Sequence, residues 1–285
     1  GANDSEGIDA AVERLAASEP VRIVMEATGG MEMQLAAALS AAGLPVAIVN
    51  PRNVRAFARS TGRLAKTDAI DAEVIARFAD KVEPACRPLP DENERSLRQL
   101  IARRRQLVDM RTMETNRQRR IISQQVAESL DTHIAYITRE IKDIDREIKR
   151  LIKASPVWRA KEDLLKSVPG IGDETAAMLV ASLPELGTLG HRQIAALVGL
   201  APMNCDSGNM RGRRKIKGGR TAVRTNLYMP TLSAIRCNPL IKQFYNRLRR
   251  AGKNAKVAIT ACMRKLLIIL NAIIRDDRPW QPILP

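Results

Sequence analysis

The sequence predicts an α/β plus all-α fold, in which a small α/β domain precedes a long helical region. Two short apolar runs, residues 21–25 and 44–49, flank a helical stretch, as in parallel strands joined by a helix. Residues 92–153 lack glycine and proline and repeat apolar side chains at helical spacing. From residue 156 onward, helical patterns alternate with glycine-containing turns. We therefore expect domains over residues 1–82, 83–155 and 156–285.

The first domain is expected to begin with a helix over 5–17 and a strand over 21–25. A helix over 30–42, closed by Gly43, leads to a second strand that ends at Asn50. This order and spacing predict a right-handed unit with parallel strands. Ligand-binding groups of such sheets lie at the carboxyl ends of the strands, and Glu26 has this position.

A pair of aspartates opens the next predicted helix, which runs from Asp68 to about Asp80. Asp68 and Asp71 are three residues apart, so both carboxylates point to one face. Asp68 alone is equally explained as a helix N-cap. Together with Glu26, however, the pair is typical of a hard-cation site, because Mg²⁺ takes few carboxylates and leaves room for water and phosphate.

Residues 81–91 contain three prolines and predict a linker. Beyond it we expect two long helices, one from about Glu92 into the 120s and one from about Asp131 to Lys153. An antiparallel helical hairpin and an oligomerising coiled coil both agree with this pattern. The cations of the first helix form either a solvated face or a nucleic-acid contact.

The C-terminal domain begins with a Pro-Gly-Ile-Gly turn between two helical patterns. This turn contains Gly170 and Gly172 and is typical of a helix-hairpin-helix, in which the turn exposes backbone amides to a phosphate. A plain helix–helix turn is the alternative. Later helices are predicted at about 221–236, 238–250 and 254–275. The last is strongly apolar, but its charged residues Lys256, Arg264 and Lys265 argue against a membrane span, so we expect a buried core helix.

A basic loop over residues 202–220 is the strongest functional candidate. Ser207 lies between Asp206 and Gly208, and six cations follow it. They are Arg211, Arg213, Arg214, Lys215, Lys217 and Arg220. Such cations would neutralise a phosphodiester and its transition state while the serine attacks phosphorus. A solvated loop without a ligand is the alternative.

The composition makes nucleic acid the first partner to consider, because the formal net charge is +16 and the pI is about 10.3. A membrane surface is the other polyanion, but no apolar run reaches spanning length. Aromatic residues make up 3% of the chain, which argues against binding mainly by stacking of bases. The four cysteines show no metal-site spacing, so we expect a reducing, cytoplasmic setting. The chain starts at Gly1, and we expect it to begin inside a longer protein.

Five stretches of the sequence resemble one family over nearly the whole chain. They are VMEATGG (24–30), residues 50–79 with both aspartates, residues 167–187 with the Pro-Gly-Ile-Gly turn, residues 199–220 with the serine loop, and CMRKLLIILNAIIRD (262–276). Together they resemble the DEDD-type transposases of bacterial insertion sequences. That family includes the Piv pilin-gene invertases and the bridge-RNA-guided recombinases.

This resemblance implies a RuvC-like (ribonuclease-H-like) domain, here partial, a helical coiled-coil hairpin, and a C-terminal transposase domain. It implies Mg²⁺- or Mn²⁺-assisted cleavage and rejoining of double-stranded DNA, a guide (bridge) RNA, and homodimers or tetramers acting at the nucleoid. Glu26, Asp68 and Asp71 match the family's carboxylates, and Ser207 matches its serine. A first aspartate of the pattern would precede residue 1.

Three functions follow as hypotheses. In a recombinase, Ser207 forms a covalent ester with DNA, and Arg211, Arg213, Arg214 and Lys217 stabilise the pentacoordinate phosphorus. In a junction-resolving nuclease, the carboxylates would suffice, with water as nucleophile. In a non-catalytic nucleic-acid-binding protein, the basic loop and the glycine turn would only bind phosphates.

Overall fold

The computed structural model describes residues 3–63, 68–86, 88–89, 91–204, 207, 212 and 214–281. It divides into two compact units, Gly1–Asp91 and Glu92–Pro285. The division falls at the end of the proline-containing segment that was predicted as a linker. The helical hairpin and the C-terminal domain, which were expected as separate domains, both belong to the second unit.

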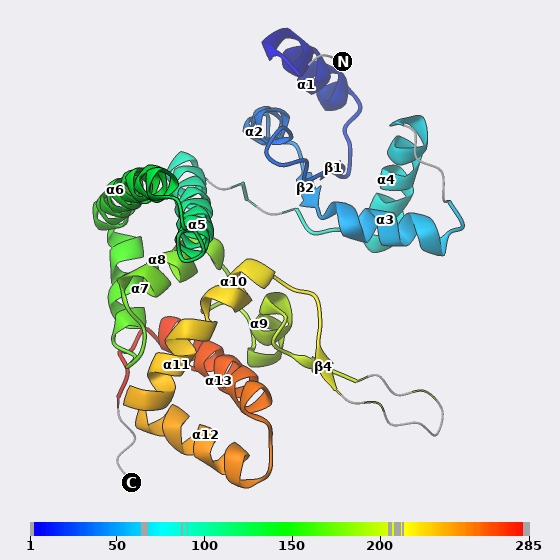
Figure 1. Cartoon of the computed structure of the whole chain (residues 1–285). Coiled ribbons are helices and arrows are strands. Elements are labelled where there is room, and N and C mark those ends of the chain that lie inside the picture. Colours follow the sequence, from blue (N-terminus) through cyan, green and yellow to red (C-terminus); the bar gives the residue numbers. More distant parts are fainter. Residues whose placement is uncertain are drawn as a thin grey trace. The chain divides into compact units, whose positions relative to one another are not determined.

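The described residues of the first unit form a parallel pair of strands and four helices (Figure 1). In chain order they are α1 (Ser5–Ala17), β1 (Ile23–Glu26), α2 (Met33–Ala41), β2 (Val46–Val49), α3 (Pro51–Ser60) and α4 (Asp68–Val82). Ile23 lies opposite Val46, and Glu26 lies opposite Val49, so the predicted strand–helix–strand unit is confirmed. The predicted start of β1 at Val21 is wrong. Glu19 has a φ of +44° and Pro20 follows it, so the chain is still turning at the exposed Val21.

The two faces of the strand pair pack against different helices. Ile23, Met25 and Val46 join apolar residues of α1 and α2, including Leu39. Val24 and Val49 join apolar residues of α3 and α4. Alternate residues of a strand point to opposite faces, so the α3–α4 face takes every second side chain of β1 from Val24 onward.

The second unit is almost entirely helical (Figure 1). Its elements are α5 (Glu92–Gln118), α6 (Gln124–Ala154), α7 (Pro156–Lys166), α8 (Asp173–Ser182), α9 (His191–Val198), β3 (Pro202–Met203), β4 (Lys215–Ile216), α10 (Thr221–Asn226), α11 (Tyr228–Cys237), α12 (Pro239–Arg250) and α13 (Ala255–Asp276).

Helices α5 and α6 form an antiparallel hairpin. Leu97, near the start of α5, packs with Ile152 near the end of α6, while Leu107 packs with Ile137 further back along α6. The second helix starts at Gln124, earlier than the predicted Asp131. Its first turns consist mainly of good helix formers without an apolar stripe, so the periodicity that defined the prediction was absent there.

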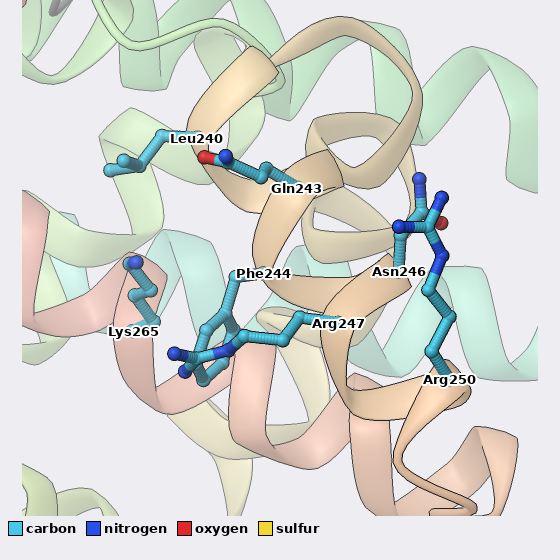
Figure 2. A pocket seen from close by; sticks show the side chains of 7 residues that line it. All are labelled: Leu240, Gln243, Phe244, Asn246, Arg247, Arg250 and Lys265. Carbon is cyan, nitrogen blue, oxygen red and sulfur yellow. The ribbon is translucent and has the colours of Figure 1, made fainter.

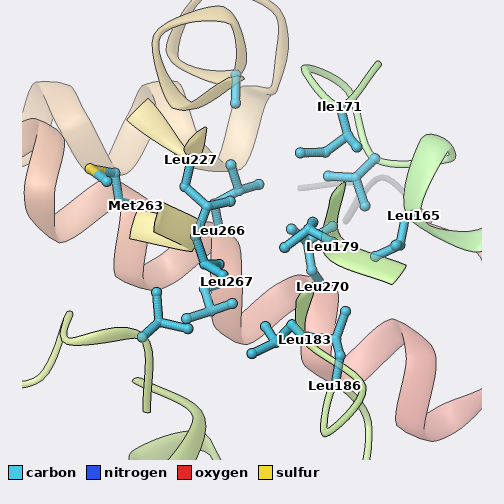
Figure 3. Packing of buried hydrophobic residues seen from close by; sticks show 14 of the residues in the cluster. Leu165, Ile171, Leu179, Leu183, Leu186, Leu227, Met263, Leu266, Leu267 and Leu270 are labelled. Carbon is cyan, nitrogen blue, oxygen red and sulfur yellow. The ribbon is translucent and has the colours of Figure 1, made fainter. Parts of the chain in front are cut away.

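Helix α13 is the centre of the core. Apolar side chains of α8, α10 and the α7–α8 turn surround it, and Figure 3 shows Leu266, Leu267 and Leu270 of α13 among them. By length and composition α13 could cross a membrane, with a mean hydropathy of 2.0. Nine of its residues are nevertheless buried in the unit, which is the pattern of the predicted core helix.

The prediction of one continuous helix over residues 221–236 is wrong. Helix α10 ends at Asn226, and α11 begins at Tyr228. Pro230 has no N–H, and in a continuous helix its ring would clash with the carbonyl group of Asn226. The chain therefore bends at Leu227, whose carbonyl oxygen accepts a hydrogen bond from Thr231 N at 3.1 Å.

Candidate functional site

Residues 199–220, here called the serine arm, connect α9 to α10. Pro202 of β3 pairs with Ile216 of β4, and Met203 pairs with Lys215, so the arm leaves the helical body as an antiparallel ribbon (Figure 1). Ser207 is exposed and forms an isolated β-bridge. The basic segment was predicted as a loop, and its root is in fact a hairpin.

Three of the predicted phosphate-binding cations, Arg214, Lys215 and Lys217, are exposed on the arm. Two others, Arg211 and Arg213, lie outside the described residues, as do Asp206 and Gly208. The arm therefore presents the hydroxyl group of Ser207 and three positive charges to solvent.

Arg220, the sixth predicted cation, is bound within the protein. Its Nη1 and Nη2 donate to the two carboxylate oxygens of Glu185 at 2.7 and 2.5 Å, and Nη1 also donates to the carbonyl oxygen of Ser182 at 2.9 Å. A bidentate pair of this kind is among the stronger polar contacts in proteins. Arg220 thus ties the end of the arm to the segment that follows α8.

Two glycines bring the ends of the arm into close contact. Gly199 and Gly219 have φ values of +75° and +69°, in the left-handed region. A Cβ atom on Gly219 would lie 2.2 Å from the backbone nitrogen of Gly199, a distance at which backbone must move. Beside them, Arg220 N donates to the carbonyl oxygen of Leu197 at 2.8 Å. Only glycine fits this crossing.

Arg224 of α10 joins both ends of the arm through one nitrogen. Its Nη1 is 2.6 Å from the carbonyl oxygen of Gly218 and 3.3 Å from those of Val198 and Gly199. Gly199, Gly219 and Arg224 therefore hold the root of the arm. Sequence reasoning missed their role, although the adjacent Gly218 and Gly219 are a signal for a tight turn.

The predicted carboxylates form a separate candidate, which lies within the first unit. Glu26 ends β1 and is half-buried. It shares a strand face with Val24, the face that packs on α3 and α4. Arg22 Nη1, just before the strand, donates to the carbonyl oxygen of Ala79 near the end of α4 at 3.3 Å. This contact joins the residue before β1 to the last turns of α4.

Asp71 lies in the first turn of α4 and is half-buried. It precedes Val74 and Ile75 by three and four residues, so it lies on the helix face that packs against the strands. Glu26 thus ends a strand, and Asp71 lies on the α4 face that packs on the strand pair. A metal site that joins the two carboxylates stays a prediction. Helix α4 begins at Asp68, whose side chain lies outside the described residues. Among the side chains that are described, no three acidic, histidine or cysteine groups lie close enough to bind a metal ion.

Glu32 fixes the turn that follows Glu26. Its Oε2 accepts hydrogen bonds from Thr28 N at 3.0 Å, Thr28 Oγ1 at 3.1 Å and Gly30 N at 2.9 Å. Partial burial disfavours the charged form, but hydrogen bonds from these groups and from its own N–H lower the pKa of Glu32 below its usual value. The residue was not a candidate from the sequence.

The Pro-Gly-Ile-Gly turn connects α7 to α8, as the sequence predicted. Gly170 has a φ of +103°, and a Cβ there would lie 2.7 Å from the backbone of Ala234. Gly172 caps α8, but Asp173 in the first helical turn already pairs with Lys149 and Lys166. This carboxylate partly satisfies the positive end of the helix dipole, so the geometry favours a packed helix–helix turn. Phosphate binding at Gly170 and Gly172 stays a prediction.

Comparisons with known proteins identify relatives of both units. A DEDD model of IS110 elements, described as a transposase, matches residues 2–126, and a model of the IS116/IS110/IS902 transposase family matches residues 162–246. The pilin gene-inverting protein of Moraxella bovis is 31% identical over 268 residues, which are 91% of this chain and 82% of that protein. An uncharacterized 43.6 kDa protein of the insertion element IS110 from Streptomyces coelicolor is 25% identical over 164 residues, 56% of this chain and 39% of that protein. The chain belongs to the IS116/IS110/IS902 family of transposases.

Proposed function

We propose that this transposase-family protein exchanges DNA strands through a covalent intermediate on Ser207. The observation that carries the proposal is an exposed hydroxyl group on a basic ribbon whose root is fixed. Gly199, Gly219 and Arg224 hold that root, while Arg214, Lys215 and Lys217 stay exposed along the ribbon. A nucleophile presented on a positioned ribbon can reach a phosphodiester in DNA without a deep pocket.

In the proposed reaction, the free energy of the broken phosphodiester bond is conserved in a phosphodiester bond between Ser207 and DNA. The Oγ atom of Ser207 forms a bond to phosphorus, and the bond from phosphorus to one deoxyribose oxygen breaks. That oxygen leaves as a hydroxyl group with the proton that the serine loses. Attack by a deoxyribose hydroxyl of another strand then reverses the step, rejoins DNA and releases the serine. Arg214, Lys215 and Lys217 would stabilise the charge on the pentacoordinate phosphorus.

The carboxylates have the chemistry of a magnesium site. Glu26 ends β1, Asp71 lies in the first turn of α4, and Asp68 begins that helix. Oxygen ligands of this kind suit Mg²⁺ or Mn²⁺, which would neutralise charge on a phosphate. The same carboxylates are also candidates to accept the serine proton.

A guide RNA and self-association complete the proposal. An RNA that pairs with the target would supply sequence specificity, so the protein would need only backbone contacts. For self-association, the end of the α5–α6 hairpin exposes Met113, Ile122 and Val126. Sedimentation of an Ile122→Lys variant tests this part, since loss of the oligomer is expected and an unchanged oligomer contradicts it.

A denaturing gel for covalent protein–DNA species tests the nucleophile. Labelled duplex from the element end, Mg²⁺ and the element's non-coding RNA are mixed with wild type, Ser207→Ala, or the control Ser233→Ala, which removes an exposed hydroxyl of α11. We expect an adduct for wild type and Ser233→Ala and none for Ser207→Ala, with similar DNA affinity in all three.

The other outcomes point to the two remaining hypotheses. An adduct that persists in Ser207→Ala contradicts the serine assignment. Cut DNA without an adduct in any protein indicates a nuclease with water as nucleophile. Salt-sensitive binding without cleavage, in Mg²⁺ and in Mn²⁺, indicates a protein that only binds nucleic acid.

A further inference from the structure

A basic groove between α12 and α13 is separate from the residues of the serine arm. Its volume is about 480 Å³, within the range of roughly 300–1,000 Å³ that is typical of small-ligand sites. It is lined by Leu240, Gln243, Phe244, Asn246, Arg247, Arg250 and Lys265. The spacing of the α12 residues by three and four places them on one broad helix face. Figure 2 shows Phe244, Arg247 and Lys265 at one end of the groove, and Asn246 and Arg250 at the other.

The groove gathers positive charge without compensation. No acidic side chain lines it, and from Ser207 to Arg275 the sequence holds seventeen lysines and arginines and no aspartate or glutamate. Among the described residues, none forms an ion pair with Arg247, Arg250 or Lys265. Burial and the neighbouring Arg247 lower the pKa of Lys265. An anion in the groove would relieve this repulsion.

The groove also contains a stacking surface. Phe57 and Phe78 pack edge to face in the core of the first unit, whereas Phe244, the third phenylalanine of the chain, lines the groove. Arg247 Cζ lies 5.1 Å from the centre of the Phe244 ring, and Lys265 Nζ lies 4.6 Å from it. The low aromatic content argues against a protein that binds nucleic acid mainly by stacking many bases on aromatic side chains. In this groove, however, one aromatic ring and one guanidinium plane lie beside further cations, so a single base could stack there.

We propose that this groove binds an unpaired nucleotide of a single strand. The base would lie against Phe244 and Arg247, with its phosphate near Lys265, and the next phosphate along the strand would meet Arg250 at the other end. Gln243 and Asn246 offer amide donors and acceptors to the base or sugar. Duplex DNA keeps its bases stacked and cannot present one to the ring, so the groove favours single-stranded DNA or RNA.

The electrostatic part is tested with neighbouring arginines in the last turn of α12. All proteins carry Ser207→Ala, so that binding is measured without covalent chemistry and independently of the proposed reaction. Labelled single-stranded DNA, RNA and duplex DNA of one sequence are titrated by fluorescence anisotropy over a range of salt concentrations. Arg250→Gln should weaken single-strand binding and reduce the salt slope by about 0.7, the value for one phosphate contact. Arg249→Gln is the control, because Arg249 donates to the carbonyl oxygen of Lys253 and does not line the groove.

The stacking part is tested with Phe244→Leu. This change should weaken single-strand binding by about fivefold or more with an unchanged salt slope, and leave duplex binding as it was. Thermal melting checks that the variant is folded. A photo-crosslink from 5-bromouracil in the strand should map to residues 240–250. If Phe244→Leu weakens binding of RNA more than binding of single-stranded DNA, the natural ligand is RNA. The reverse result identifies single-stranded DNA.

Two results would overturn the proposal. One is equal loss of single-strand binding in Arg250→Gln and Arg249→Gln. The other is a folded Phe244→Leu protein that binds single strands as tightly as wild type does, or that loses as much affinity for duplex DNA as for single strands. Because Arg250 is exposed, its variant tests the groove even if the substitution of Phe244 disturbs packing.

Discussion

Adjacent glycines at the root of the serine arm allow a matched test of its rigidity. Gly218 and Gly219 have φ values of +68° and +69°, so alanine is equally strained at both positions. A Cβ on Gly218 meets nothing within 4 Å, whereas a Cβ on Gly219 would lie 2.2 Å from Gly199 N and 2.6 Å from its Cα. The difference between Gly219→Ala and Gly218→Ala therefore isolates the contact that holds the arm.

The magnitudes follow from these geometries. Left-handed alanine costs about 1–2 kcal/mol in both variants. In Gly219→Ala the backbone must also separate from 2.2 Å to beyond 3.0 Å, and overpacking of this kind adds about 1–3 kcal/mol. In a unit of this size, each kcal/mol lowers Tm by about 2–4 °C.

Two assays separate stability from positioning. Thermal unfolding should show a larger loss of Tm for Gly219→Ala than for Gly218→Ala. Below both transitions, covalent complex formation with DNA should fall about tenfold or more in Gly219→Ala and stay near wild type in Gly218→Ala, because a small displacement of a nucleophile is costly. Equal Tm and equal adduct yield in the two variants would refute the role of the glycine contact.

Three further predictions concern polar and buried groups. Arg104→Met should lower unfolding stability by about 1–3 kcal/mol in denaturant titrations, because Arg104 Nε is bound to Asp145 Oδ1 at 2.5 Å and that carboxylate loses its partner; a change below about 0.5 kcal/mol contradicts this. Because the pKa of Glu32 is lowered in the folded protein, its carboxylate stabilises the fold at pH values above the ordinary pKa of 4.5, and this stabilisation is lost as the pH falls through the lowered pKa. Urea unfolding at several acidic pH values should therefore show a weaker dependence of stability on pH in Glu32→Gln than in wild type. The same pH dependence in both proteins would contradict this role of Glu32. Burial raises the pKa of Cys262 to about 11, so iodoacetamide at about pH 8 should label the exposed Cys237 and spare Cys262 in peptide mass spectra, whereas equal labelling contradicts its burial.

Much of the fold could be predicted because its signals are local. Buried strands with apolar runs, a helix that starts at Asp68 and a long stretch without glycine or proline each correspond to an observed element. Errors occurred where local signals were weak or in conflict. The break at Leu227 depends on a proline three residues later, and the start of α6 lacks an apolar stripe.

The candidate site was only partly predictable. The residue types of Ser207, Glu26 and Asp71 predicted a nucleophile and a cation site, and these roles stay predictions. The roles of Arg220 and Arg224 could not be read from the sequence. A cation in a basic run looks like a ligand contact, and only the fold shows that Arg220 reaches Glu185 and that Arg224 reaches the carbonyl oxygen of Gly218.

The most direct test of the account is to identify the residue that carries DNA in the covalent complex. Trypsin cleavage after Arg192 and Arg211 releases residues 193–211, in which Ser207 is the only hydroxyl-bearing residue. After nuclease digestion of the complex, mass spectrometry should find a nucleotide phosphate on this peptide, with fragment ions that place it at Ser207. A nucleotide on any other peptide, or its retention in Ser207→Ala, would contradict the assignment of Ser207 as the nucleophile.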